Sequence, residues 1–179
     1  MSKKSFACLA FYFLALAVYF LDQWLKLWVV DHMGLYQSIP LVKDYFALTY
    51  VRNIGAAFSA FSGQVWALAL VAGSVSVAII VYMHRLKEIT LGHVLSLGLL
   101  LGGTLGNFSD RVRLGYVVDM FDAQWQGRNF FPIFNVADIA IDTGVAILLL
   151  IFFLESREAK RVAAAQAQGG DSSDAHPAR

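Results

Sequence analysis

The sequence has few charged residues and almost no cysteine. Of its 179 residues, 15% are charged and one, Cys8, is a cysteine. A single cysteine excludes an internal disulfide and a cysteine-built metal site. Cys8 lies in an apolar run, where a free thiol is usually buried and inert. The formal net charge is +1, which gives no reason to expect a nucleic-acid partner.

The sequence is rich in long apolar runs. Hydrophobic residues make up 58% of the chain and the mean hydropathy is +0.60, whereas soluble domains are about half apolar and a quarter charged. Four segments are long enough to cross a bilayer, which takes roughly 20 apolar residues. They are residues 6–30, 65–83, 91–107 and 136–154. The sequence therefore predicts a mainly α-helical membrane protein, built as a bundle of four transmembrane helices.

The first apolar run is expected to be a retained helix. Lys3 and Lys4 before it resemble the start of a signal peptide. However, the run continues to Val30, which is too long for a signal peptide, and it has no convincing small-residue cleavage site. Basic residues in short connections indicate the cytoplasmic side, so both termini are predicted to be cytoplasmic. These residues are Lys3, Lys4, Arg85, Lys87, Arg157, Lys160 and Arg161.

Two connecting segments are then predicted to lie outside, residues 31–64 and 108–135. In the first, residues 39–51 are rich in β-branched and aromatic residues, which predicts a small extracytoplasmic β-sheet resting on the bilayer. The small residues of 52–58 suit a close approach of backbones. The second segment is predicted to be an aromatic-rich extracytoplasmic loop in the headgroup region.

The domain organisation is predicted to be simple. Residues 1–155 form one membrane domain, and residues 156–179 form a cytoplasmic tail. The tail first continues the fourth helix for a few turns and then becomes rich in glycine, serine and aspartate, which predicts disorder at its end.

Polar residues on three predicted helices fall at one depth. Asp22, Asn107 and Asp138 each lie 16 positions from the inner end of their apolar run. At 1.5 Å per residue, each is roughly 24 Å above the cytoplasmic boundary. The hydrocarbon core is about 30 Å thick, so all three are expected just beneath its outer surface. Ionisable groups inside a membrane are costly and usually functional, so this level is the predicted site.

Asp119 and Asp138 are the candidate catalytic pair. When two carboxyl groups share a low-dielectric site, they do not both ionise easily, so one keeps a proton at a higher pH. The ionised group can then accept a proton from water while the protonated group donates to the substrate. The structural alternative is that Asp138 caps the fourth helix and Asp119 is an ordinary loop residue.

Further polar residues follow a glycine-rich helix end. Gly103 and Gly106 allow helices to approach closely. Asn107 and Arg111 are four apart and share a helix face. Arg111 is a candidate for binding a phosphate or a backbone carbonyl, with Asp110 orienting it. The alternative is an ion pair at the helix end.

The remaining candidates have supporting roles. Asp22 and Lys26 are spaced as a structural i, i+4 pair, with Lys26 expected to extend to the headgroups. Asn53 suits either a substrate backbone or the small sheet, and Asn135 is placed to orient Asp138. Asp142 lies one turn deeper than Asp138, and the sequence names no partner for it. The four histidines show no metal-ligand spacing, so neither a metal nor a cofactor is predicted.

These motifs together resemble the lipoprotein signal peptidases, the type II signal peptidases of bacteria. Five blocks occur in order between Asp22 and Asp142, and no single block would be specific on its own. The blocks are Asp22-Gln23-x-x-Lys26, Arg52-Asn53-x-Gly55-Ala56-Ala57-Phe58, Gly102-Gly103-x-x-Gly106-Asn107-x-x-Asp110-Arg111, Val117-Val118-Asp119 and Phe134-Asn135-x-Ala137-Asp138.

The resemblance implies an aspartyl endopeptidase of the bacterial inner membrane that is blocked by the cyclic peptide globomycin. It implies cleavage of prolipoproteins on the N-terminal side of a diacylglyceryl-modified cysteine, near the outer leaflet and in contact with membrane lipids. One active site per chain suggests a working monomer. Asp119 and Asp138 match the catalytic positions of the family, and Asp22 matches a position important for stability or activity. Asp142 departs from the small or uncharged residue expected there. The positions that contact substrate and inhibitor are matched by Asn53, Asn107, Arg111 and Asn135.

Two other classes of function compete with this interpretation. A proton-coupled carrier would use Asp22, Asp138 and Asp142 as a relay, but it predicts polar residues through the full depth of the bundle. The inner two-thirds of the first, second and fourth helices hold almost none apart from Asp142. A non-catalytic lipid-binding protein predicts that the loss of single aspartates is tolerated.

Overall fold

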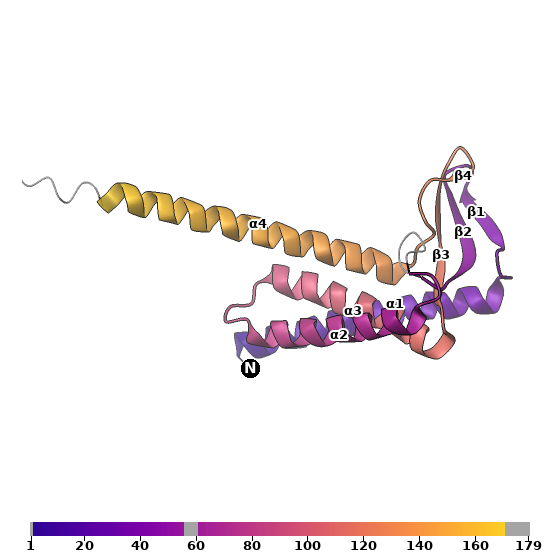
Figure 1. Ribbon diagram of the computed structural model, residues 1–179, viewed down its shortest axis with the longest axis horizontal. Coiled ribbons are helices and arrows are strands. Elements are labelled where there is room, and N and C mark those ends of the chain that lie inside the picture. The colour runs from indigo at the N-terminus through magenta and orange to yellow at the C-terminus, as the bar shows by residue number, and fades with distance from the viewer. Residues whose placement is uncertain (1, 56–60, 171–179) are drawn as a thin grey trace, which may run out of the picture.

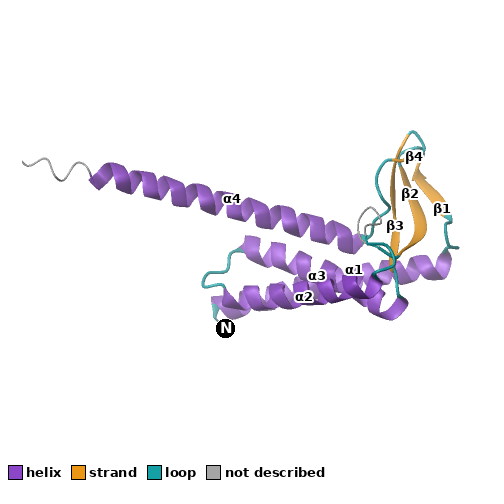
Figure 2. Cartoon of the chain, in the orientation of Figure 1, coloured by secondary structure: helices purple, strands orange, loops and turns teal. Residues whose placement is uncertain are grey.

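The computed structural model describes residues 2–55 and 61–170 as a bundle of long helices with a small sheet at one end (Figures 1 and 2). The close backbone approach predicted for residues 52–58 involves Ala56, Ala57 and Phe58, which lie outside the described residues. The end of the tail also lies outside them. The helices are α1 (Lys3–His32), α2 (Val65–Arg85), α3 (Leu91–Leu114) and α4 (Val136–Gly170). The strands are β1 (Ser38–Val42), β2 (Phe46–Asn53), β3 (Val117–Trp125) and β4 (Arg128–Asn129).

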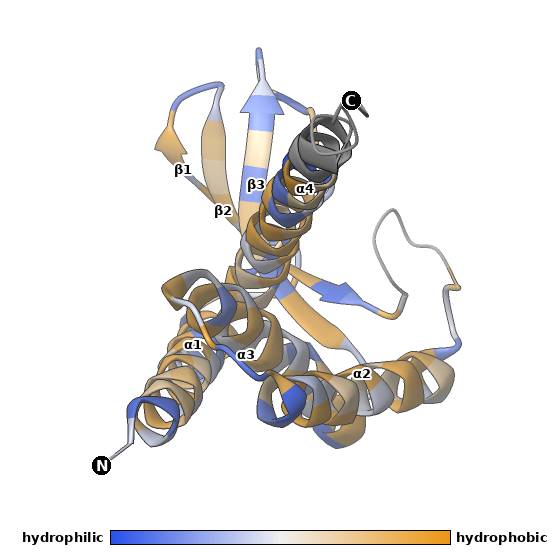
Figure 3. Ribbon diagram, turned by 90° about the vertical axis from the view of Figure 1, so that its left-hand side faces the viewer, coloured by the Kyte–Doolittle hydropathy of each residue, from blue (hydrophilic) through white to orange (hydrophobic). Residues whose placement is uncertain are grey.

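All four predicted spans are confirmed as helices long and apolar enough to cross a membrane. Most residues of the four helices are hydrophobic (Figure 3). Phe13, Leu70 and Leu149 are among the exposed side chains, as expected where lipid replaces water. Along its most apolar window α3 is 67% buried, whereas each of the other three helices is 17% buried. Helix α3 is therefore the central helix, and it packs against α1, α2 and α4.

Glycines set the spacing between α3 and its neighbours. A Cβ atom at Gly103 would fall on the backbone carbonyl oxygen of Ala137 in α4. A Cβ atom at Gly106 would fall on the carboxylate of Asp22 in α1. Close packing of this kind is a main source of association between helices in lipid, where the hydrophobic effect is absent. It also brings polar side chains of three helices within hydrogen-bonding distance.

The sheet is antiparallel, with the strand order β1-β2-β3-β4. The sequence assigned it to the first outer segment alone, but the second outer segment contributes β3 and β4. Strand β3 carries two buried aspartates, Asp119 and Asp122, on opposite faces, and these break the apolar alternation by which strands are usually recognised. Val118 and Met120 of β3 pack against Val29 and Met33 at the end of α1. The sheet is thereby fixed to the outer end of the bundle.

Helix α3 is longer than predicted by about two turns. It ends at Leu114, before Gly115, which has a left-handed conformation with φ of 78°. Glycine adopts this conformation without strain and is common directly after a helix. Asp110 and Arg111 are therefore helical residues, on the same rigid element as Asn107.

We predict that Gly103→Ala lowers the free energy of unfolding by about 1–3 kcal/mol, the usual cost of overpacking. The added methyl group meets a backbone carbonyl, so α3 and α4 have to move apart. Thermal unfolding in detergent measures the effect. Gly92→Ala on the same helix is the control, since its methyl group meets only the flexible end of Ile151. Equal melting temperatures for the two variants would contradict the prediction.

Candidate active site

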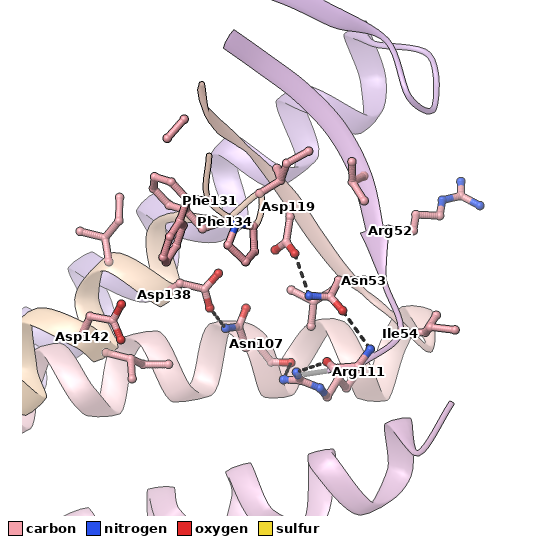
Figure 4. A pocket seen from close by; sticks show the side chains of 18 of the residues that line it. Arg52, Asn53, Ile54, Asn107, Arg111, Asp119, Phe131, Phe134, Asp138 and Asp142 are labelled. Carbon is pink, nitrogen blue, oxygen red and sulfur yellow. Dashed lines mark hydrogen bonds between the residues drawn. The ribbon is translucent and has the colours of Figure 1, made fainter. Parts of the chain in front are cut away.

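A cavity of about 1020 Å³ lies where the sheet meets the helices. Its walls come from β2, β3, α2, α3, α4 and the segment between β4 and α4. Asp119 and Asp138 both project into it (Figure 4). The two aspartates come from different kinds of element. Asp119 lies on a strand of the sheet, and Asp138 lies in the first turn of a membrane helix.

Asp119 is held by two amide side chains. It lies on β3 opposite Val51 of β2 and is only 2% exposed. Asn53 at the end of β2 donates from Nδ2 to Asp119 Oδ2 at 3.0 Å. Asn135 donates from Nδ2 to Asp119 Oδ1 at 2.7 Å. Each oxygen of Asp119 is thus held by a different amide.

Asp138 is held by the start of its own helix. The capping residue is Asn135, not Asp138 as the structural alternative had it. The Asp138 backbone N–H donates to Asn135 Oδ1 at 2.9 Å, and the Asn135 backbone N–H donates to Asp138 Oδ2 at 3.1 Å. This reciprocal arrangement is a capping box. Asn135 therefore contacts both aspartates and sets their relative position.

Asn107 joins the two aspartates from the central helix. Its Nδ2 donates to Asp138 Oδ1 at 2.8 Å. Its Oδ1 accepts from Asn135 Nδ2 at 3.1 Å and from Lys26 Nζ at 3.0 Å. The three residues predicted to share one depth, on α1, α3 and α4, therefore belong to one connected network, because Lys26 also bonds Asp22.

Lys26 does not extend to the headgroups as expected. Its side chain is 3% exposed and lies between Asp22 and Asp110, with Nζ–O distances of 2.8 and 3.0 Å. An unpaired charge at this depth would be very costly, so the ammonium group is stabilised by the two carboxylates that surround it. The expectation failed because a lysine near a helix end reaches outward only when no buried acid is available to it.

The two structural carboxylates also hold the backbone next to the candidate pair. Asp22 Oδ1 accepts from the Ala137 backbone N–H at 2.9 Å, one residue before Asp138. Asp110 Oδ2 accepts from the Val118 backbone N–H at 3.1 Å, one residue before Asp119. Asp110 therefore does not orient Arg111, as the sequence suggested, but fixes the start of β3.

Arg111 contacts backbone rather than a carboxylate. Its Nη2 donates to the Gly55 carbonyl at 3.0 Å, and its Nη1 donates to the Asn107 carbonyl at 3.3 Å. The sequence predicts that Arg111 binds either a phosphate or a backbone carbonyl, and these contacts are of the second kind. Arg111 also lines the cavity, so it connects the segment after β2 to the central helix beside the site.

One supporting residue was missed from sequence. Gln23 is buried and donates from Nε2 to Asp110 Oδ1 at 2.9 Å. It also accepts from Arg113 Nη1 at 3.3 Å. Its place directly after Asp22 in the first motif was the available signal.

Asp142 lines the cavity and is exposed.

The electrostatics of the pair suit acid–base chemistry. Burial raises the pKa of Asp119 to about 7, from an ordinary value of 3.8, and the nearby charge of Asp138 adds to the effect. The hydrogen bonds from Asn53 and Asn135 act in the opposite direction. Near neutral pH the two groups can therefore hold one proton between them, which is the state that aspartic peptidases use.

Four membrane-spanning helices with two carboxyl groups facing one cavity define the class of membrane-embedded aspartic peptidases. Residues 14–154 match the sequence model of signal peptidase II, peptidase family A8. The chain is 41% identical over 152 residues to the lipoprotein signal peptidase of Pseudomonas putida, covering 83% of this chain and 89% of that protein. It is 43% identical over 151 residues to that of Geobacillus kaustophilus, covering 84% and 97%.

Solved structures agree with these matches. A bacterial membrane enzyme determined by the in meso method at 2.3 Å resolution has a TM-score of 0.75 and 28% identity, covering 80% of this chain and 87% of that chain. A second such enzyme, at 1.9 Å, has a TM-score of 0.70 and 30% identity, covering 78% and 90%. The chain belongs to the signal peptidase II family. It is a multi-pass membrane peptidase that removes signal peptides from prolipoproteins, which confirms the resemblance and disfavours the carrier.

We predict that Lys26→Met lowers the free energy of unfolding by about 3–5 kcal/mol, as expected when one partner of a buried ion cluster is removed. Asp22 and Asp110 are then left without a counter-charge. Thermal unfolding in detergent measures the loss. Lys43→Met is the control, because Lys43 is exposed on the turn after β1. A Lys26→Met protein as stable as wild type would show that the cluster is not stabilising.

We predict that Asp119 makes the folded protein less stable as pH rises. The unfolded chain releases this proton near 3.8, and the folded protein keeps it to about 7. Between these values the folded state binds more protons, so its stability falls with rising pH and then levels off. Melting temperatures at pH 5, 6, 7 and 8 test this. Asp119→Asn should show a shallower decline, and an unchanged slope would contradict the assignment.

Proposed function

We propose that Asp119 and Asp138 are the catalytic residues that cleave prolipoproteins on the N-terminal side of a diacylglyceryl-modified cysteine. The observation that carries the proposal is that two carboxyl groups from separate elements share Asn135 as a hydrogen-bonding partner and open into one cavity. The raised pKa of Asp119 supports it, since a pair that shares one proton supplies an acid and a base at once.

In this mechanism the shared proton resides on Asp119, because burial and, secondly, the charge of Asp138 raise the pKa of Asp119 to about 7. Ionised Asp138 accepts a proton from a water molecule, which attacks the carbonyl carbon of the bond to be cut. Asp119 donates its proton to the carbonyl oxygen as the tetrahedral intermediate forms. The proton on Asp138 then passes to the leaving amine, and the intermediate's hydroxyl proton returns to Asp119 as the carboxylic acid forms, so the original state is restored.

The substrate-binding residues are proposed to be Asn53, Asn107, Arg111 and Asn135, which surround the pair. Phe130 and Phe134, from the segment between β4 and α4, add apolar lining to the cavity. A lipid-modified cysteine is held at the membrane surface by its acyl chains, so its peptide bond arrives near the level of the pair. Such tethering replaces a search in solution with a restricted one.

The orientation that fits this substrate has the sheet outside the inner membrane and both termini in the cytoplasm. The N-terminus and the connection between α2 and α3 lie at the end of the bundle away from the sheet (Figure 1). There Lys4 Nζ donates to the carbonyls of His84 and Leu86 at 3.2 and 3.0 Å, beside Arg85 and Lys87. This concentration of positive charge supports a cytoplasmic assignment. Every residue of the proposed site comes from one chain, which supports a working monomer.

The test is cleavage of a diacylglyceryl-modified prolipoprotein beside its unmodified precursor, by purified protein in detergent. We expect lipid-dependent cleavage by wild type and a loss of about 10³-fold or more in Asp119→Asn and in Asp138→Asn, within the range for acid–base groups. Asp122→Asn is the matched control, since Asp122 lies on the opposite face of the same strand and bonds Thr49 and Gln124 instead.

Folding of each variant is checked by thermal unfolding. Near-normal cleavage by either folded single variant would overturn the two-aspartate mechanism. Equal cleavage of modified and unmodified precursor would overturn the lipid requirement.

A further inference from the structure

Asp142 is an acidic side chain in a membrane helix that has no hydrogen bond or ion pair to any residue within 2–55 or 61–170. It is exposed and lines the cavity. Carboxylates at membrane depth are costly, and those that occur are nearly always paired or face a polar cavity. The other acids nearby obey this rule, since Asp22 and Asp110 are both bonded to Lys26. Asp142 has no such partner among the described residues and meets the rule only by facing the cavity.

The side chain points to the place where substrate must lie. Asp142 is four residues from Asp138, so the two share one face of α4 and are separated by about 6 Å along its axis. Both carboxyl groups project into the same cavity (Figure 4). Asp138 is at the sheet end of α4, and Asp142 is one turn further into the membrane.

Neither of the two arginines that line the cavity, Arg52 and Arg111, is placed to supply this partner. Arg52 lies on β2, donates to the Tyr50 hydroxyl at 3.0 Å and points away from Asp142 (Figure 4). A Cβ atom at Gly144 would meet Ser96 and Leu100, and one at Gly103 would meet Ile141. Asp142 is therefore level with residues 100–103 of α3. Arg111 is at least eight residues further along α3, which is about 12 Å, and it already donates to two backbone carbonyls.

We propose that Asp142 accepts a hydrogen bond from the signal peptide, within the few residues before the cleaved bond, and so helps to determine specificity. The signal peptide is the apolar part of the substrate and stays in the membrane, whereas the mature protein leaves on the sheet side. The substrate part level with Asp142 is therefore the signal peptide. A carboxylate requires a donor, which there is a serine or threonine hydroxyl or a backbone N–H. The ester oxygens of the lipid offer none.

This inference rests on the proposed catalytic pair, because it takes Asp138 as the point of cleavage. The experiment uses four diacylglyceryl-modified prolipoproteins. The parent has alanine at each of the three positions before the cleaved bond, and each of the others has serine at one of them. Values of kcat/KM are measured for wild type, Asp142→Ala, Asp142→Asn and, as a control on the same wall, Thr143→Val. Melting temperatures check folding.

If a hydroxyl is the donor, wild type prefers one serine substrate by about tenfold, the least expected of a hydrogen bond to a charged group. Asp142→Ala then loses the preference and Thr143→Val keeps it. If a backbone N–H is the donor, Asp142→Ala loses about tenfold on all four substrates without a lower melting temperature. Asp142→Asn recovers part of the effect in either case, because its carbonyl still accepts.

The inference is overturned if Asp142→Ala stays within twofold of wild type on every substrate and leaves the ratios unchanged. It is also overturned if Thr143→Val has the same effect as Asp142→Ala. Failure of wild type to cut the parent would instead contradict the proposed function, so the two failures are distinguishable.

Discussion

The site depends on one buried ammonium group. Lys26 lies between Asp22 and Asp110 in a part of the protein that lipid surrounds. These two carboxylates also accept hydrogen bonds from the backbone N–H groups directly before Asp138 and Asp119. Asp22 does so through its other oxygen, and Asp110 through the same oxygen that meets Lys26. One lysine on α1 thus fixes the first turn of α4 and the first residues of β3 relative to each other. Burying these three charges costs free energy of desolvation. The buried cluster in turn positions both members of the proposed catalytic pair.

The amide side chains around the pair orient the two carboxyl groups. A carboxyl group held at one oxygen can still rotate, whereas Asp119 is held at both oxygens by Asn53 and Asn135. Asn135 also caps α4, so the same residue ends an outer segment, begins a membrane helix and spaces the pair. Catalytic groups are most effective when their geometry is set before the substrate arrives. Here it is set by elements that meet where the sheet joins the helix bundle.

The helices and the site motifs were predictable from sequence, and the pairwise contacts were not. Hydropathy alone located four spans, because a bilayer demands apolar length and little else. Strand β3 was missed because Asp119 and Asp122 lie on opposite faces and break the apolar alternation expected of a strand with one buried face. The burial of Lys26 was missed for a related reason. Its partner Asp110 is 84 positions away in the chain, and no spacing rule relates them.

The distribution of polar residues across the helices follows from which of them lipid can reach. Asn107 and Asp110 of the central helix α3 are buried, because α1, α2 and α4 pack around this helix. Helices α1 and α4 place their polar groups on the faces toward α3. Asp142 differs from this pattern, since it lies on the part of α4 that faces the open cavity rather than the packed side of α3. A charge that the bundle does not compensate marks the part of the wall that the folded protein leaves for its substrate to cover.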